Sequence, residues 1–161
     1  MSRIAALHKK INSIFTRINE VPPKYPHLIE VSQACALLAV KRGQNAELAT
    51  MAGLLHDIAV LRSHDIEPYT IHGVTGENHA AMSAEIAMEI LLEIGLTSPE
   101  ENEIICNAVK KHADKNNTDT PFDEVLKDAD VFAHGLSDIN LKNFRGHRWD
   151  NVCLELGINL A

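Results

Sequence analysis

Apolar residues recur at intervals of three and four along most of the chain, which is the pattern of amphipathic helices. The first such run covers residues 4–18 and stops before three prolines in residues 22–26, where a helix cannot continue. Glycine, proline or polar stretches separate the later runs. We expect further helices at about 27–42, 45–58, 79–94, 99–112, 121–135 and 149–156. The alternating pattern of a half-buried strand does not occur.

These patterns predict an all-α fold, a single-domain helical bundle of about six to seven helices. The length of 161 residues suits one domain spanning 1–161. Within it we distinguish an N-terminal helix at 1–20, a core at 25–136 and a C-terminal extension at 137–161. The periodicity fails over residues 62–78, which include Pro68, Gly73 and Gly76. Loops of that length are usually functional.

Composition narrows the choice of partner and location. The formal net charge is −7, and no run of Lys or Arg forms a basic stripe, so a groove-bound nucleic acid is not expected. Because the chain has neither a signal-peptide pattern nor 18 uninterrupted apolar residues, we expect a cytoplasmic protein without a membrane segment. The three cysteines are widely spaced and odd in number, which favours buried small hydrophobes over a disulfide or thiolate zinc site.

The most specific local feature is the pair His56-Asp57 at the end of an apolar helical run. Neighbours on a helix point about 100° apart, so both can reach one ion only where the helix ends or lies deep in a bundle. A cation would offset the cost of desolvating the carboxylate there. The pair alone is better explained by a histidine at a helix C-terminus followed by an aspartate that starts the next turn.

Four further residues change that balance. His27 opens the second predicted helix, His79 the fourth, His112 closes the fifth, and Asp130 lies within the sixth. The order His, His-Asp, His, His, Asp on successive helices resembles the HD superfamily of metal-dependent phosphohydrolases, in its dinuclear branch. The likeness extends from about residue 25 to residue 136. It includes the residues around these motifs, namely Ala52-Gly53-Leu54-Leu55, Ser83-Ala84 and Ala129.

The resemblance implies a first metal site formed by His27, His56, Asp57 and Asp130. A second site would be completed by His79 and His112, with Asp57 bridging the two ions and central to catalysis. Imidazole and carboxylate ligands without thiolate suit Fe, Mn, Co, Ni or Zn, and Mg at an oxygen-rich position. A mononuclear alternative needs only the first four residues. In that alternative His79 and His112 contact substrate or act as acid catalysts.

The activity that this resemblance implies is hydrolysis of a phosphomonoester or phosphoanhydride in a small, nucleotide-like substrate by a metal-activated water. One alternative is a catalytically silent module that senses metal or nucleotide, and another is an oxygen-activating di-iron protein. The chain could form a homodimer under any of these three interpretations.

The sequence departs from the family pattern after the His-Asp pair. Many relatives have a glycine and then a lysine there, and the lysine commonly helps to bind phosphate, whereas Ala59 and Val60 follow Ile58 here. The candidates to replace that lysine are Arg62, Lys110, Lys111 and Lys115, each of which is also explained as a surface charge. His134 lies four residues after Asp130 on the same helical face, which suggests a role behind the ligands. His64 and Asp65 fall in the loop and could line or gate the mouth of the site. His72, in the same loop, competes with His79 for the ligand assignment but lacks the helix that follows His79.

Overall fold

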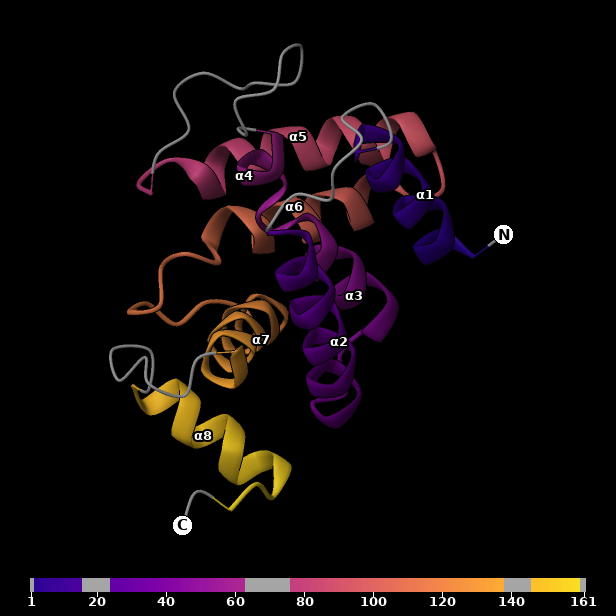
Figure 1. The fold of residues 1–161 in the computed structure, drawn as a ribbon. Helices are drawn as coiled ribbons and strands as arrows, with labels where there is room; N and C mark the ends of the chain where they lie inside the picture. Colours follow the sequence, from indigo (N-terminus) through magenta and orange to yellow (C-terminus); the bar gives the residue numbers. More distant parts are fainter. Residues whose placement is uncertain (1, 16–23, 63–75, 138–145, 160–161) are drawn as a thin grey trace.

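The computed structural model describes residues 2–15, 24–62, 76–137 and 146–159. Within these ranges it contains helices and no strand, which confirms the predicted all-α fold (Figure 1). The helices are α1 (Arg3–Phe15), α2 (Tyr25–Lys41), α3 (Ala46–Leu55), α4 (Ile58–Arg62), α5 (His79–Ile94), α6 (Pro99–Lys111), α7 (Pro121–Ser137) and α8 (His147–Leu156).

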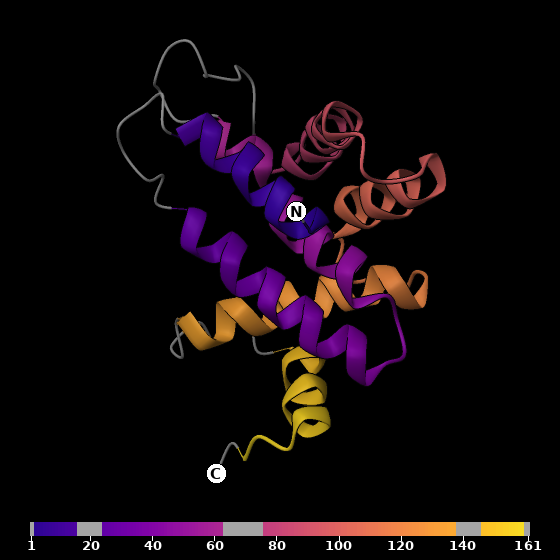
Figure 2. The ribbon, with the colours of Figure 1, turned by 90° about the vertical axis from the view of Figure 1, so that its right-hand side faces the viewer.

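Helix α2 packs against both α3 and α7, and these three helices form the middle of the molecule (Figures 1 and 2). Helices α5 and α6 lie side by side, and α6 also contacts α3 and α7. Helix α1 covers α3 and α5, while α8 lies on the outer side of α7. The core is aliphatic, as the composition predicts, and its fully buried residues include Leu28, Leu38, Leu54, Leu55, Ile105 and Leu126.

Local chemistry sets several helix ends where the sequence predicts them. The Asn45 side chain accepts a hydrogen bond from the Leu48 amide and caps α3. Ser98 and Glu101 form a capping box at the start of α6. Gly95 ends α5 with φ of 64°, a left-handed conformation that favours glycine.

The structure differs from the sequence prediction at the His-Asp pair. The apolar pattern predicts one helix at 45–58, but α3 ends at Leu55 and α4 begins at Ile58, with His56 and Asp57 in the turn between them. This break, together with the five-residue α4, brings the described helices to eight. Apolar periodicity cannot reveal such a break, because Leu55 and Ile58 are both fully buried.

Some expectations fall outside the described residues. These are the long loop at 63–75, with its residues His64, Asp65 and His72, and the side chain of Arg62 at the end of α4. The three cysteines are buried, as expected, and none of them forms a disulfide within the described residues. In the part of the chain that the structure describes, no helix combines the length and apolar character needed to cross a bilayer.

Candidate metal centre

The six predicted ligand residues lie together, although they come from five separate parts of the chain. His27 is in the first turn of α2, His79 opens α5, and Asp130 lies in α7. His56 and Asp57 occupy the turn between α3 and α4, and His112 follows α6 directly. All except His79 are buried, and the His79 side chain is 20% exposed. The site therefore lies inside the bundle, and among these six residues His79 is the one most exposed to solvent.

Asp57 lies at the centre of this group. Its Oδ1 atom is 3.4 Å from Nε2 of His112 and 3.6 Å from Nε2 of His79, and its Oδ2 atom is 3.7 Å from Nε2 of His56. These separations are longer than ordinary hydrogen bonds. Two ligand atoms bound tetrahedrally to one ion, each at about 2.1 Å, would be about 3.4 Å apart. The spacing therefore suits shared coordination of a cation.

The two oxygens of Asp130 have different partners. Oδ1 is 3.1 Å from Nε2 of His27, 3.7 Å from Nε2 of His56 and 3.4 Å from Nε2 of His134. Oδ2 instead accepts a 2.7 Å hydrogen bond from the Lys115 ammonium. Only one oxygen of this carboxylate thus faces the imidazole groups.

Three of the histidine rings are oriented by the same main-chain contact. Each places Nδ1 against the carbonyl oxygen three residues earlier: His56 on Gly53 at 2.8 Å, His79 on Gly76 at 2.9 Å and His112 on Val109 at 2.7 Å. A carbonyl oxygen can only accept, so Nδ1 carries the proton and Nε2 of the neutral ring keeps a lone pair. All three Nε2 atoms face Asp57, and ligating histidines are commonly oriented in this way.

Electrostatics favours a neutral His56 ring beside ionised Asp57 and Asp130. Burial lowers the pKa of His56 to about 4. Burial also opposes ionisation of Asp57, but the His56 and His112 rings hold its pKa below the usual range. Burial acts in the same way on Asp130, whose pKa the Lys115 ammonium and His27 hold well below the usual range. This protonation state is the one that binds metal ions.

Among the described residues, two buried atoms at the centre lack a hydrogen-bond partner, and both belong to the His-Asp pair. They are Nε2 of His56 and Oδ1 of Asp57. A buried polar atom without a partner costs about 1–3 kcal/mol, and more if it is charged. A divalent cation between them would satisfy both atoms, so the residues fit a metal centre.

The ligand atoms form three overlapping groups, within each of which they lie no more than 4.8 Å apart. These are His27 with His56 and Asp57, Asp57 with His79 and His112, and His27 with Asp130 and His134. The first two share Asp57, the residue expected to bridge two ions. The third includes His134, which the sequence suggested only as a residue behind the ligands. Coordination by these residues stays a prediction.

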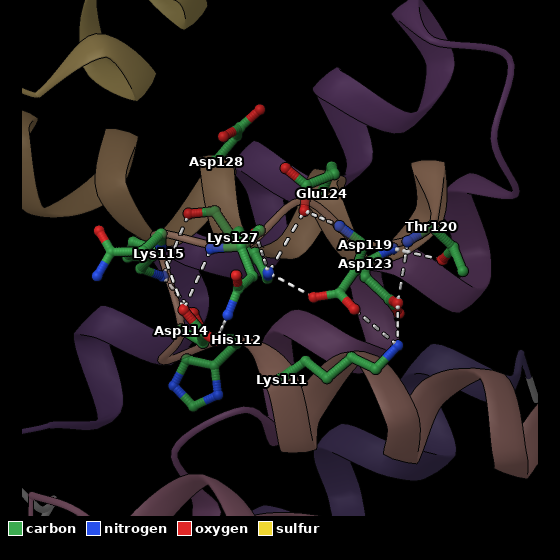
Figure 3. A network of polar contacts seen from close by, with 12 residues as sticks. Lys111, His112, Asp114, Lys115, Asp119, Thr120, Asp123, Glu124, Lys127 and Asp128 are labelled. Atoms are coloured by element: carbon green, nitrogen blue, oxygen red, sulfur yellow. Dashed lines mark hydrogen bonds and ion pairs between the residues drawn. The ribbon is translucent and has the colours of Figure 1, made fainter.

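The lysines proposed for substrate binding have different surroundings. Lys115 lies at the site, where its ammonium donates a hydrogen bond to the Asp130 carboxylate. Lys111 does not: its ammonium pairs with Asp123 and Asp119, and it lines a separate cavity of about 300 Å³ that includes Asn45. Asn45 caps the end of α3 opposite His56, about 15 Å away along the helix. In Figure 3 the Lys111 side chain and the His112 ring point in opposite directions.

Two residues near the site were not identified from the sequence. Lys127, in α7, is fully buried, and its ammonium donates to the Asn117 carbonyl and to Asp119 (Figure 3). Arg148, in α8, is 7% exposed and donates to the Lys115 carbonyl. The spacing of three residues between Glu124 and Lys127, whose side chains pair at 3.4 Å, was a usable signal. Arg148 offered none, because Lys115 is 33 residues away in sequence.

Comparison with known proteins identifies one family profile and several relatives that are similar to this chain. The profile of the HD domain matches residues 25–135. Ribonuclease Y of Enterococcus faecalis is 33% identical over 86 residues, which are 53% of this chain and 13% of that protein. Ribonuclease Y 2 of Levilactobacillus brevis is 28% identical over 107 residues, 66% of this chain and 17% of that protein. Ribonuclease Y of Nitratidesulfovibrio vulgaris is 29% identical over 122 residues, 63% of this chain and 24% of that protein.

The chain spans less than a quarter of the length of these relatives. No solved structure matches it significantly.

Proposed function

The chain belongs to the HD domain family, and from this premise we propose that it hydrolyses a phosphomonoester or phosphoanhydride bond in a small, nucleotide-like substrate. The observation that carries the proposal is the pair of buried atoms, Nε2 of His56 and Oδ1 of Asp57, that have no hydrogen-bond partner in the part of the chain that the structure describes. They lie among further imidazole and carboxylate groups and leave a divalent cation as the natural partner.

The proposed ligand set is the one that the family resemblance implies. One ion would be held by His27, His56, Asp57 and Asp130, and a second by His79, His112 and the shared Asp57. Fe, Mn, Co, Ni and Zn all fit a mixed set of imidazole and carboxylate ligands, in which Mn and Mg prefer the carboxylate oxygens and the others the imidazole nitrogens. A bound divalent cation lowers the pKa of water and neutralises charge on phosphoryl oxygens.

The protein's own groups prepare this centre before metal binds. The carbonyl contacts of His56, His79 and His112 hold each ring so that Nε2 faces Asp57. The low pKa of His56 keeps its ring unprotonated. Asp57 therefore needs little rearrangement to bind a cation, and prior organisation of this kind is the protein's main contribution in metal catalysis.

The names of the relatives raise a second candidate, the phosphodiester bond of RNA. Those proteins are called ribonucleases, and their matched segments are a small part of each. The net charge of −7 and the lack of a basic stripe argue against a long RNA on this chain. A short oligoribonucleotide therefore belongs in the substrate panel.

The test compares wild-type protein with Asp57→Asn. Phosphate release from nucleoside mono- and triphosphates, and cleavage of a short RNA, are measured with Mn²⁺, Co²⁺ or Fe²⁺. Mutation of a residue that only supports a metal ligand lowers activity by up to roughly 100-fold. We expect Asp57→Asn, which changes a proposed ligand itself, to lower activity by more than that. Asp150→Asn, at an exposed position in α8, is the matched control and should retain activity.

Other results would point elsewhere. Activity that survives both metal removal and Asp57→Asn contradicts the proposal. Metal-dependent nucleotide binding without product favours the silent sensor module. An iron requirement with oxygen consumption favours the oxidative alternative.

A further inference from the structure

The Lys115 ammonium is fully engaged inside the site. Its Nζ donates to Oδ2 of Asp130 at 2.7 Å, to the His112 carbonyl at 2.7 Å and to the Lys127 carbonyl at 3.3 Å. A lysine ammonium has three N–H donors, so each of them has an acceptor here. Lys115 is therefore bound to a ligand residue and is not free to contact a substrate phosphate.

This contact leaves Asp130 with one oxygen for a cation. Its Oδ1 faces Nε2 of His27, His56 and His134, whereas Oδ2 is held by Lys115. A carboxylate can otherwise bind an ion through both oxygens. The ligand atoms around Asp130 are consequently rich in imidazole nitrogen and poor in carboxylate oxygen.

We propose that Lys115 determines the metal preference of this centre by keeping Asp130 a one-oxygen ligand. Imidazole nitrogen favours ions such as Zn²⁺, whereas carboxylate oxygen favours Mn²⁺ and Mg²⁺. The proposal rests on the metal centre of the proposed function. It gives Lys115 a role in place of the substrate contact expected from the sequence.

Lys115 is itself held in position by Arg148. The guanidinium donates from Nε to the Lys115 carbonyl at 2.9 Å and from Nη2 to the Asn117 carbonyl at 3.3 Å. Its Nη1 pairs with Glu124 and Asp128 at 2.8 and 2.7 Å. Arg148 lies outside the residues matched by the HD domain profile, so the segment beyond that match contributes a positioning residue to the site.

Lys127 holds the same segment from the side of α7. Its ammonium donates to the Asn117 carbonyl at 2.7 Å and to Asp119 at 2.6 Å (Figure 3). The segment between His112 and Thr120 is thus fixed to α7 by Lys127 and to α8 by Arg148.

The experiment measures the affinities of the full chain for Zn²⁺ and Mn²⁺ by competition with a metal-binding dye. Both ions are divalent, so loss of the Lys115 ammonium changes their electrostatic attraction to the site equally. The ratio of the two affinities therefore reports whether Oδ2 of Asp130 has become available as a ligand. We expect Lys115→Met to move the ratio of affinities about tenfold toward Mn²⁺. Tenfold is the lower end of the change in metal affinity that follows mutation of a residue hydrogen-bonded to a ligand. Lys110→Met, at an exposed position of α6, should leave it unchanged.

A second pair of variants tests the role of Arg148. Arg148→Met should move the ratio in the same direction, because the Lys115 main chain loses its anchor. Arg42→Met is the matched control, since Arg42 also pairs with Asp128, at 2.8 Å, but its other partner is Glu155 in α8. We expect Arg42→Met to keep the wild-type ratio, with thermal melting confirming that each variant is folded.

An unchanged ratio in folded Lys115→Met overturns the proposal. A raised KM with an unchanged ratio does so too, because Lys115 would then act on the substrate. If Lys115→Met does not fold, Arg148→Met against Arg42→Met decides. Wild-type protein that binds neither ion would instead contradict the proposed function, so the two failures are distinguishable.

Discussion

His56 is fully buried, and its two ring nitrogens have different surroundings. Nδ1 lies 2.8 Å from the Gly53 carbonyl, and Nε2 lacks a hydrogen-bond partner while facing Asp57 and Asp130. Burial lowers its pKa from 6.5 to about 4. The folded protein therefore holds this ring neutral in a pH range where the unfolded chain protonates it.

This difference predicts a pH dependence of stability in chelator-treated protein. Between pH 6.5 and about 4 the unfolded chain binds a proton at His56 that the folded chain does not. The free energy of unfolding should therefore fall as the pH is lowered, by up to about 1.4 kcal/mol per pH unit. Urea unfolding at several pH values measures this slope.

The control variants separate His56 from other histidines. His56→Gln should reduce the slope between neutral pH and pH 4, and His147→Gln, at an exposed position, should not. Equal slopes in all three proteins would show that His56 is not the cause.

At the scale of elements, two glycines allow helices to approach closely. A Cβ atom on Gly53 of α3 would lie 2.6 Å from Cα of Ser32, which is main chain of α2. A Cβ atom on Gly135 of α7 would lie 2.0 Å from the ring of Trp149 in α8. The first contact can be relieved only by moving a helix, and the second by moving a side chain.

Gly53→Ala should therefore separate α2 from α3, the two helices that carry His27 and lead into His56. Overpacking of this kind costs about 1–3 kcal/mol of unfolding free energy. Denaturant unfolding measures the loss, with Gly76→Ala as the control because a Cβ there meets nothing within 4 Å. Equal stability of the two variants would contradict the close packing of α2 and α3.

Gly135→Ala should displace Trp149 and loosen α8. Trp149 is the single tryptophan of the chain, is 4% exposed and stacks on Phe132 with ring centroids 5.6 Å apart. Its fluorescence therefore reports the docking of α8 directly. We expect a red-shifted emission and stronger quenching by iodide, and unchanged emission would show that α8 accommodates the methyl group.

At the scale of the whole molecule, a bound cation would join parts of the chain that are far apart in sequence. The proposed ligands come from α2, the turn after α3, α5, the residue after α6, and α7. In the unfolded chain these residues are dispersed, so an ion that needs several of them binds the folded state preferentially.

Divalent metal should therefore stabilise the protein against heat. At about 100 times the dissociation constant, linkage gives about 2.7 kcal/mol, which for a domain of this size raises Tm by about 5–10 °C. Differential scanning fluorimetry with Mn²⁺, Zn²⁺ or EDTA measures the shift. Asp57→Asn should reduce it, and a Tm indifferent to metal and chelator would argue against the centre.

The sequence alone determined the all-α fold, most of the helices and the set of candidate ligands. Apolar periodicity and the capping residues Asn45, Ser98 and Gly95 act over a few positions, so they can be recognised without a fold. The order of histidines and aspartates was sufficient to identify the family.

Only the tertiary structure decided how these residues are used. The break at His56-Asp57 is invisible to a pattern whose flanking residues are both buried. Lys111 and Lys115 are four residues apart, yet one pairs with Asp119 and Asp123 and the other with Asp130. Arg148 reaches the Lys115 carbonyl from another helix. Such contacts depend on packing between distant segments, which local sequence patterns do not record.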